Sequence, residues 1–564
     1  MARALANIGI YGISGDGDGI GLLDGKKVFV RGALPGETAA VRLEKSRSSY
    51  LLGVAEQISE PSPERVAPAC PVYGRCGGCS MMHMPYDMEL ECKRMKVADA
   101  FERVGGIKGA RVYPVVRHAP APGGARDIAQ GGELGGTAAE CATAGGAETE
   151  CAPRYRNKAQ LAFEHRHGSE PEIGYFEPRS HAIVGISDCA LQKRAAAEAM
   201  QAMREWASAP GNGSRLISDV VVRTGERTGD AMAILVSLAP DVPGIGDLSR
   251  RLAAAVSGLK SVIVNANPQG RGADVAHCAR SGSGRTRGAG ETGNAGGACG
   301  AGETGGSQNS ACVADGDLPP GGAGEAGSGQ DCVCVAVGGQ PPGGARRQGK
   351  RPRLGGSFAT VWGDGHIYEQ MCGCRFRISP ASFFQVNTRM AELVYGEILS
   401  LAAPSRSDAV LDLYCGTGSI SIFLARRAGN VVGVELSEDA VRDARFNARL
   451  NGAANARFIA GNAEAEARRL DAGGARFAAV VLDPPRKGCG AGAIESVLAL
   501  APPKILYLSC DPATMARDAA ALLAGGMYRL ECVQPFDMFP RTSSVEALAL
   551  FCRVARNAAR KMAP

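Results

Sequence analysis

The sequence lacks long hydrophobic runs. No apolar stretch reaches the roughly 20 residues that a membrane-spanning helix needs, and the segment from Met1 to Asp18 has no core of the signal-peptide type. A strong charge imbalance is also absent, because the formal net charge of +6 is only a mild bias toward polyanions and does not establish a nucleic-acid partner. We therefore expect a soluble, cytoplasmic protein without membrane contact.

Two stretches lack the large apolar side chains that a packed core requires. Residues 119–152 are rich in Ala and Gly, and residues 269–356 contain 26 glycines. Neither stretch can bury enough surface to offset the entropy of ordering the chain, so we predict two disordered insertions. The basic residues between Arg346 and Arg353 suit RNA phosphates, although a solvated linker explains them more simply.

With 564 residues, the chain is long enough for three or four domains. Over residues 1–62, short strands separated by tight turns predict a small β-barrel of about five strands. Residues 63–375 are predicted to form a central α+β domain that contains both insertions. The expected elements outside the C-terminal part are strands at 27–30, 41–44, 50–58, 218–223, 231–237 and 261–265, and a helix at 194–207.

Residues 376–564 have a regular alternation of apolar strands and amphipathic helices. The strands are expected at 409–413, 431–434, 457–459, 478–482 and 505–508, with helical segments such as 419–427 and 440–450 between them. Such an alternation predicts an α/β domain, in which a parallel sheet carries helices on both faces.

Polar or glycine-rich turns follow the predicted strands of this domain. The first strand leads into Asp412-Leu-Tyr-Cys-Gly-Thr-Gly418, the second into Glu435, the third into Asn462 and the fourth into Asp483-Pro-Pro. A glycine turn alone also suits a dinucleotide site. A dinucleotide site, however, predicts a fuller Gly-x-Gly-x-x-Gly motif, whereas Ser419-Ile-Ser421 follows Gly418 here. The two aspartates favour S-adenosylmethionine.

The fifth strand ends at Ser509-Cys510-Asp511-Pro512. This turn places Cys510 at the carboxyl end of a strand, where open α/β sheets bind their ligands. A thiolate in that place is a candidate nucleophile, and the simpler alternative is a small packed residue, as most cysteines are.

A second cysteine pattern lies far upstream. Cys70, Cys76 and Cys79 follow the spacing Cys-x₅-Cys-x₂-Cys, with Cys189 as a fourth candidate. In a large chain expected in a reducing compartment, metal or cluster ligation is a better use of such cysteines than disulfides. Four thiolates suit zinc or an iron–sulfur cluster, and the spacing does not separate the two.

These motifs together resemble the RNA uracil-5-methyltransferase family. The resemblance covers nearly the whole chain apart from the two insertions, and the N-terminal barrel is similar to the family's TRAM domain, an RNA-binding module of the OB type. The motifs that carry it are Ser382-Phe-Phe-Gln-Val-Asn387, Asp412–Gly418, Leu482-Asp-Pro-Pro-Arg-Lys-Gly488 and Ser509-Cys-Asp-Pro-Ala-Thr514.

The resemblance implies a Rossmann-like methyltransferase domain and assigns roles to individual residues. Cys510 is implied as the nucleophile and Glu546 as the carboxylate that removes a proton. The cofactor S-adenosylmethionine is expected at Gln385, Tyr414, Glu435, Asn462 and Asp483. The resemblance also favours a 4Fe-4S iron–sulfur cluster in the central domain, with the metal ligands Cys70, Cys76, Cys79 and Cys189.

One departure from the family pattern lies beside Glu546. The family has the form His-Thr-x-His-Val-Glu, whereas this chain has Arg541-Thr-Ser-Ser-Val-Glu546. The glutamate is kept while its neighbours differ, and a salt-bridging strand residue is the alternative interpretation of Glu546. Residues 155–160 match the family's central domain and are expected to contact RNA.

The resulting prediction is an enzyme that methylates carbon 5 of a specific uridine in 23S ribosomal RNA before full ribosome assembly. The four cysteines and the TRAM-like barrel favour ribosomal RNA over tRNA. A tRNA uracil-5-methyltransferase and a non-catalytic RNA-binding protein are the alternatives. No obligatory protein partner is expected.

Overall fold

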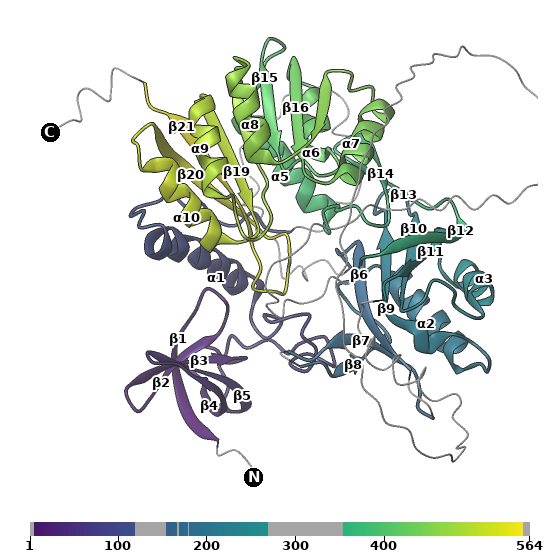
Figure 1. Cartoon of the computed structure of the whole chain (residues 1–564). Coiled ribbons are helices and arrows are strands. Elements are labelled where there is room, and N and C mark those ends of the chain that lie inside the picture. Colours follow the sequence, from purple (N-terminus) through teal and green to yellow (C-terminus); the bar gives the residue numbers. More distant parts are fainter. Residues whose placement is uncertain (1–4, 119–153, 166–167, 179, 269–353, 556–564) are drawn as a thin grey trace, which may run out of the picture.

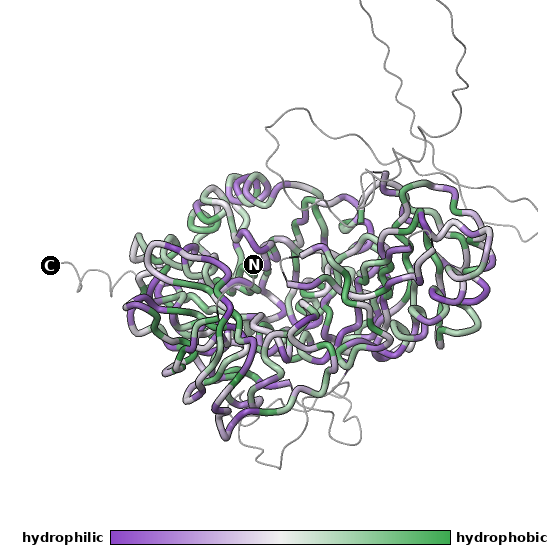
Figure 2. The backbone as a smooth tube through the Cα atoms, turned by 90° about the horizontal axis from the view of Figure 1, so that it is seen from below, coloured by the Kyte–Doolittle hydropathy of each residue, from purple (hydrophilic) through white to green (hydrophobic). Residues whose placement is uncertain are grey.

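The computed structural model describes residues 5–118, 154–165, 168–178, 180–268 and 354–555, arranged as a barrel, a central domain and a C-terminal domain (Figure 1). Hydrophobic and hydrophilic stretches alternate along the chain (Figure 2). No helix among these residues combines the length and apolar character needed to cross a membrane. The predicted insertion 119–152 lies outside the described residues, and so does the predicted insertion 269–356 except for its last three residues, 354–356.

The N-terminal domain is a closed barrel with the strand order β1-β2-β3-β5-β4. The barrel forms because successive side chains along a strand point alternately inward and outward. In β3, Val28 and Val30 point into the core, while their neighbours face outward. The five-stranded barrel predicted from the sequence is confirmed. Its strands are β1 (Ala6–Ile13), β2 (Gly19–Leu23), β3 (Lys26–Arg31), β4 (Thr38–Ser46) and β5 (Tyr50–Glu60).

The central domain has a seven-stranded sheet in the order β12-β11-β10-β9-β6-β7-β8. Helices α2 and α3 pack together and bury apolar side chains with the sheet, which confirms the predicted α+β character. Its elements are β6 (Lys158–Glu164), β7 (Glu172–Phe176), β8 (Ile183–Gly185), α2 (Arg194–Ser208), η2 (Ser214–Leu216), β9 (Ile217–Thr224), β10 (Ala231–Ser237), α3 (Ile245–Ala255), β11 (Leu259–Ala266) and β12 (Ser357–Gly363).

The C-terminal domain has a seven-stranded sheet in the order β17-β16-β15-β18-β19-β21-β20. Strands β15 to β19 are parallel, and β21 pairs antiparallel with both β19 and β20. The strands are β15 (Ala409–Leu413), β16 (Asn430–Glu435), β17 (Ala456–Ala460), β18 (Ala479–Leu482), β19 (Lys504–Ser509), β20 (Tyr528–Phe536) and β21 (Glu546–Arg553). The helices are α5 (Thr388–Ala402), α6 (Ser419–Ala425), α7 (Glu438–Leu450), α8 (Ala463–Ala472), α9 (Ala491–Leu500) and α10 (Pro512–Leu523).

Side-chain alternation along these strands builds two cores, one on each face of the sheet. Val410 and Leu506 pack with α5, α6 and α7, whereas the next residues, Leu411 and Tyr507, pack with α8, α9 and α10. Since both faces are covered, the strands are mostly apolar, as parallel strands usually are, and polar side chains such as Asp412 and Glu435 lie toward their carboxyl ends. The doubly wound α/β domain predicted from the sequence is confirmed.

Two segments that the sequence placed in the central domain pack on the C-terminal domain. The hairpin of β13 (Ile367–Met371) and β14 (Cys374–Ile378) lies against α5, α6 and α7, so a boundary after residue 375 cuts through β14. Helix α1 (Tyr86–Asp99) and the π-helical segment η1 (Ala100–Val104) pack against α10 (Figure 1). Local periodicity does not say which core a helix or hairpin joins, and this explains the difference.

Candidate active site

The carboxyl ends of β15, β16, β18 and β19 meet at one edge of the C-terminal sheet. From β15 the chain continues to β16 and β17 on one side, and then returns to β18 and β19 on the other. The reversal between β15 and β18 is a topological switch point, where open α/β sheets bind ligands. Glu435 ends β16, Asp483 follows β18 and Cys510 follows β19, so the predicted site residues share this edge.

The turn after β15 has an unusual backbone. Tyr414 is a non-glycine residue at φ 67°, and Gly418 opens α6 at φ 79°. A Cβ atom on Gly418 would lie 2.8 Å from the ring of Phe458, so a side chain does not fit there. The Glu435 carboxylate fixes the turn by accepting hydrogen bonds from the backbone N–H groups of Gly416 (3.2 Å) and Ser437 (2.9 Å). Such left-handed backbone at a non-glycine residue is typical of functional sites.

Two acidic side chains at this edge have strongly raised pKa values. Burial raises the pKa of Asp412 to about 7, and nearby Glu435 adds to the shift. Burial and the neighbouring Asp412 raise the pKa of Asp483 to about 7. Ser421 Oγ donates to Asp412 Oδ2 at 2.5 Å, whereas Asp412 Oδ1 is buried and has no hydrogen-bond partner in the described chain. Carboxylates crowded in this way favour a ligand that carries positive charge.

Cys510 and Glu546 come together through the pairing of β19 with β21. Ser509 lies opposite Ala547, so the adjoining residues, Cys510 and Glu546, meet at the same end of the two strands. The Glu546 side chain is buried, with 4% of its surface exposed. This antiparallel register brings the predicted nucleophile next to the predicted base, although they are 36 positions apart in the sequence.

The electrostatic surroundings couple these two residues to Asp483 and Arg486. The pKa of the Cys510 thiol is raised by burial and by Glu546, and Arg486 opposes that shift. The pKa of Glu546 lies well above its usual range because of burial and Asp483, again opposed by Arg486. Arg486 was not singled out from the sequence, although it lies within the motif that contains Asp483, and this motif was the signal that could have identified it.

The local sequence explains how Cys510 is presented. The Asp511 side chain caps α10 by accepting hydrogen bonds from the N–H groups of Ala513 (3.0 Å) and Thr514 (3.1 Å), and Pro512 occupies the first turn. These are strong helix-start signals. They end β19 abruptly and place Cys510 just before the positive end of the α10 dipole.

Gln385 lies in a loop that the central domain holds in place. Its carbonyl oxygen accepts a hydrogen bond from Asn157 Nδ2 at 2.8 Å, and Asn157 N donates to Val386 O at 2.9 Å. Within the stretch 155–160, expected to contact RNA, Tyr155 and Asn157 are therefore buried in contacts with protein. Beside Gln385, the Phe383 side chain is 66% exposed.

Asn462 lies just beyond β17 and has a structural task. Its side-chain oxygen caps α8 by accepting hydrogen bonds from the N–H groups of Glu464 (3.0 Å) and Ala465 (3.2 Å). The cap occupies this oxygen and leaves the amide nitrogen for a ligand.

Arg541, which replaces a histidine of the family pattern, points toward α1. Its guanidinium contacts Met84 O at 3.5 Å and Glu89 Oε2 at 3.7 Å, and it lies over the Tyr86 ring. Arg541 itself has φ 68°. In the described structure, the Arg541 side chain therefore contacts residues at and just before the start of α1.

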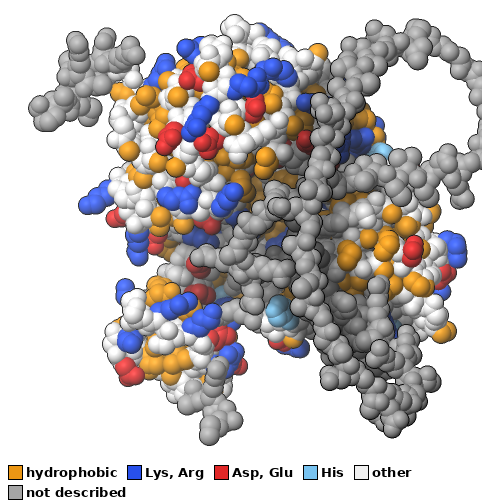
Figure 3. Space-filling view, viewed as in Figure 1, with side chains coloured by type: hydrophobic (Ala, Val, Ile, Leu, Met, Phe, Trp, Pro, Cys, Tyr) orange, Lys and Arg blue, Asp and Glu red, His pale blue; other side chains and the backbone are white. Residues whose placement is uncertain are grey.

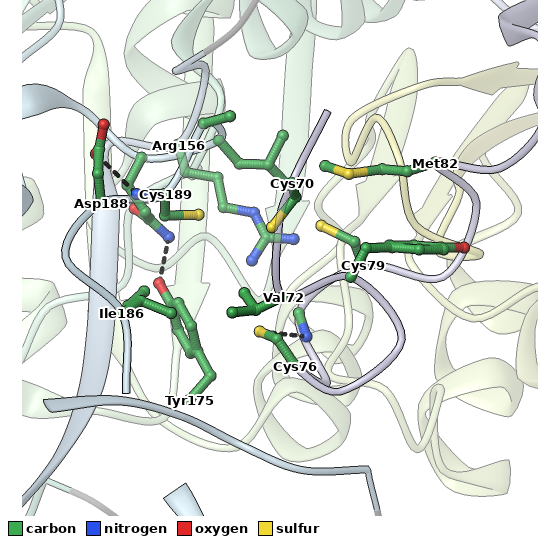
Figure 4. Close-up of a pocket in the computed structure, with 15 residues that line it drawn as sticks. Cys70, Val72, Cys76, Cys79, Met82, Arg156, Tyr175, Ile186, Asp188 and Cys189 are labelled. Carbon is green, nitrogen blue, oxygen red and sulfur yellow. Dashed lines mark hydrogen bonds between the residues drawn. The ribbon is translucent and has the colours of Figure 1, made fainter. Parts of the chain in front are cut away.

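The four cysteines that the sequence grouped as ligands line a single cavity (Figure 4). Burial raises the pKa of the Cys79 thiol to about 12, an effect opposed by Arg156 and increased by the other three cysteines. Within the described chain, no three ligand side chains already lie close enough together to hold a metal ion. The fold thus brings Cys70, Cys76, Cys79 and Cys189 to the lining of one cavity, but in the described chain not to metal-binding distance of one another.

Comparison with known proteins places two parts of the chain in described families. Residues 370–554 match the family described as tRNA (uracil-5-)-methyltransferase, and residues 7–55 match the TRAM domain. A relative from Halalkalibacterium halodurans is 30% identical over 553 residues, covering 97% of this chain and 96% of its own length. One from Caldanaerobacter subterraneus is 31% identical over 554 residues, covering 97% and 98%. Both bear the name uncharacterised RNA methyltransferase.

A solved structure has the same fold over almost the whole chain. It is the tRNA (uracil-54, C5)-methyltransferase of Pyrococcus abyssi in complex with S-adenosyl-L-homocysteine. The TM-score is 0.60 at 21% sequence identity, and the match covers 97% of this chain and 100% of the Pyrococcus chain.

Proposed function

Because this chain belongs to the RNA uracil-5-methyltransferase family, we propose that it methylates carbon 5 of one uridine in 23S ribosomal RNA, with S-adenosylmethionine as methyl donor. The observation that carries the proposal is the meeting of Cys510 and Glu546 beside the crowded carboxylates of the switch point. A non-catalytic RNA-binding protein has no need for a thiol and a buried carboxyl at that position.

The carboxylates at the strand ends suit S-adenosylmethionine, which supplies an electrophilic methyl group on a positively charged sulfur when bound. Asp483 and Glu435 are proposed to bind it, Glu435 through the ribose hydroxyls. Tyr414 lies in the strained turn, and Gln385 and Asn462 complete the proposed set. The buried free oxygen of Asp412 adds negative charge that a cationic ligand would offset.

Carbon 5 of uracil is too weak a nucleophile to take a methyl group directly. The Cys510 thiolate is proposed to add to carbon 6, forming an S–C6 bond and pushing an electron pair into an enolate whose carbon 5 is nucleophilic. Arg486 beside the sulfur favours the thiolate. The target base must leave its stack to reach Cys510, which favours RNA that is not yet fully assembled into ribosomes.

After methyl transfer, carbon 5 holds both the new methyl group and its original proton. Glu546 is proposed to accept this proton, after which the S–C6 bond breaks and Cys510 leaves. The raised pKa of Glu546, caused by burial and Asp483, makes its ionised form a stronger base.

The choice of RNA rests on two features of the chain. The TRAM domain and the four-cysteine cavity favour 23S ribosomal RNA, and Lys and Arg side chains are spread over the barrel and the C-terminal domain in the view of Figure 3. A tRNA substrate is the second candidate, favoured by the family description for residues 370–554. Either RNA would place the protein in the cytoplasm.

Methyl incorporation into defined RNAs tests the proposed function. We expect label from S-adenosylmethionine to enter naked 23S RNA, at one uridine, and to enter assembled large subunits much less. Incorporation into tRNA alone would establish the second candidate, and no incorporation into any RNA would contradict an enzymatic role.

We propose that the four-cysteine cavity holds a 4Fe-4S cluster. The donor set fits: thiols from two distant segments face one space, and Figure 4 shows the Arg156 side chain extending among them. In the described part of the chain, Arg156 has no ion pair with a carboxylate. Even a partly buried cation is costly without such a partner, so its surroundings should be anionic, as four iron-bound thiolates are. Because four protein ligands would leave no open position for chemistry, the cluster would have a structural role.

Anaerobically purified protein is expected to absorb in the visible range and to contain about four irons per chain. Cys189→Ala should lose most of this iron and absorbance, because it removes the ligand contributed by the central domain. Cys92→Ala, a buried cysteine that does not line the cavity, is the matched control and should retain both. Stoichiometric zinc without iron would contradict the cluster.

A further inference from the structure

The connection between β20 and β21, residues 537–545, leads directly into Glu546 and is called here the base loop. Its first side chain, Asp537, is fully buried. Because Glu546 is the first residue of β21, the position of its carboxyl depends on how this loop is anchored.

Other segments anchor the base loop by its backbone oxygens. Five of its nine carbonyl groups accept hydrogen bonds from outside the loop. The pairs are Asn387 Nδ2 to Met538 O (3.1 Å), Lys93 Nζ to Phe539 O (3.2 Å), Tyr155 OH to Pro540 O (3.1 Å), Ser80 N and Met81 N to Arg541 O (3.0 and 3.2 Å), and Lys96 Nζ to Ser543 O (2.9 Å). Such anchoring leaves the loop little freedom to shift.

A buried ionic group holds the start of the loop. Lys93 on α1 lies between Glu89 (2.7 Å) and Asp537 (2.5 Å), and all three side chains have 0% exposure. Asp537 also accepts a hydrogen bond from Tyr86 OH at 2.6 Å. Buried ion pairs add little net stability, but each partner is costly to leave alone, so they fix one arrangement.

The same loop is linked to the four-cysteine cavity by two short paths. Arg156, which lines the cavity, donates from Nε to Tyr155 OH at 3.1 Å, and that hydroxyl donates to Pro540 O. Ser80 directly follows Cys79 and donates to Arg541 O. Ser80 Oγ also accepts a hydrogen bond from Ser543 N at 3.1 Å.

We propose that Tyr155 and Lys96 are positioning residues that hold Glu546 in place through the base loop, and that Tyr155 connects the cysteine cavity to the proton-removal step. The proposal rests on the proposed function, since it takes Glu546 as the base. Its consequence is selective: weakening these anchors slows the loss of the carbon 5 proton, while thiolate addition and methyl transfer, which depend on Cys510 after β19, continue.

Tyr155→Phe tests this in the full-length, cluster-loaded protein. The ring stays buried, and only the hydroxyl that bonds Pro540 O is lost. With RNA tritiated at carbon 5 of uridine, single-turnover tritium release reports proton removal, and methyl label from S-adenosylmethionine reports transfer. We expect release to slow about fivefold relative to transfer, the scale of one hydrogen bond, with transient build-up of a protein–RNA adduct.

Lys96→Met is the second test, because Lys96 lies on the partly exposed side of α1, and its ion pair with the exposed Asp16 (2.8 Å) is of a kind that adds little stability, so its loss should be tolerated. The same selective slowing is expected, since the bond to Ser543 O disappears. Tyr528→Phe is the matched control: its buried hydroxyl also donates to a proline carbonyl, Pro502 O at 2.8 Å, but near the far end of β20 and β21. It should leave the ratio of release to transfer unchanged.

The positioning role would be overturned if the ratio of tritium release to methyl transfer is unchanged in both Tyr155→Phe and Lys96→Met, whether or not both steps slow together. That result leaves the proposed function intact as long as the unaltered protein methylates RNA. Absence of methylation by the unaltered protein would instead contradict the proposed function itself.

Discussion

Glu546→Gln is expected to stop the reaction with methylated RNA still joined to the protein. The amide cannot accept the carbon 5 proton, so Cys510 cannot leave, while thiolate addition and methyl transfer remain possible. Turnover should fall by about 10²- to 10⁴-fold, the usual contribution of a general base. The adduct should survive denaturing electrophoresis and carry label from both the RNA and the methyl group.

Glu531→Gln serves as the control for this result. It makes the same change on the neighbouring strand β20, at a side chain paired with Arg529, and no adduct should accumulate. If Glu546→Gln turns over at the normal rate, another group or a water removes the proton. The Arg541 side chain is poorly placed for that task, since its contacts in the structure are with Met84, Glu89 and the Tyr86 ring.

Cys510→Ala is expected to abolish both methyl transfer and the covalent RNA adduct. Without the thiolate, carbon 5 never becomes nucleophilic, and loss of a covalent nucleophile costs on the order of 10⁴-fold or more. Binding of S-adenosylmethionine, measured by calorimetry, should change little, because the proposed ligand residues are elsewhere on the sheet edge.

Cys552→Ala is the matched control, since Cys552 is a partly buried thiol on β21 that lies opposite Lys504, at the other end of β19 from Cys510. It should retain activity and adduct formation. Methyl transfer by Cys510→Ala at a substantial rate would contradict covalent catalysis. An adduct with Glu546→Gln and none with Cys510→Ala would order the two residues on one pathway.

Local sequence patterns predicted the architecture well. The period of two in Lys27–Val30, and the apolar strands followed by glycine, acidic or proline turns, identify the barrel and the parallel sheet from short-range information alone. The turn chemistry at Ser509–Pro512 also fixes Cys510 at a strand end, because the Asp511 cap and Pro512 together start α10. Such features depend on neighbours in the chain.

The tertiary structure decided which distant residues meet. The register of β19 with β21 brings Glu546 to Cys510, and packing against the central domain brings Cys189 to the cavity of Cys70, Cys76 and Cys79. No pattern in the sequence pairs Lys93 with Asp537, which are 444 positions apart. The resemblance named Cys510, Glu546 and the four cysteines one by one. Local periodicity reports which face of an element is buried and not what covers it, so the proximity of these residues and the anchors of the base loop became visible only in the folded chain.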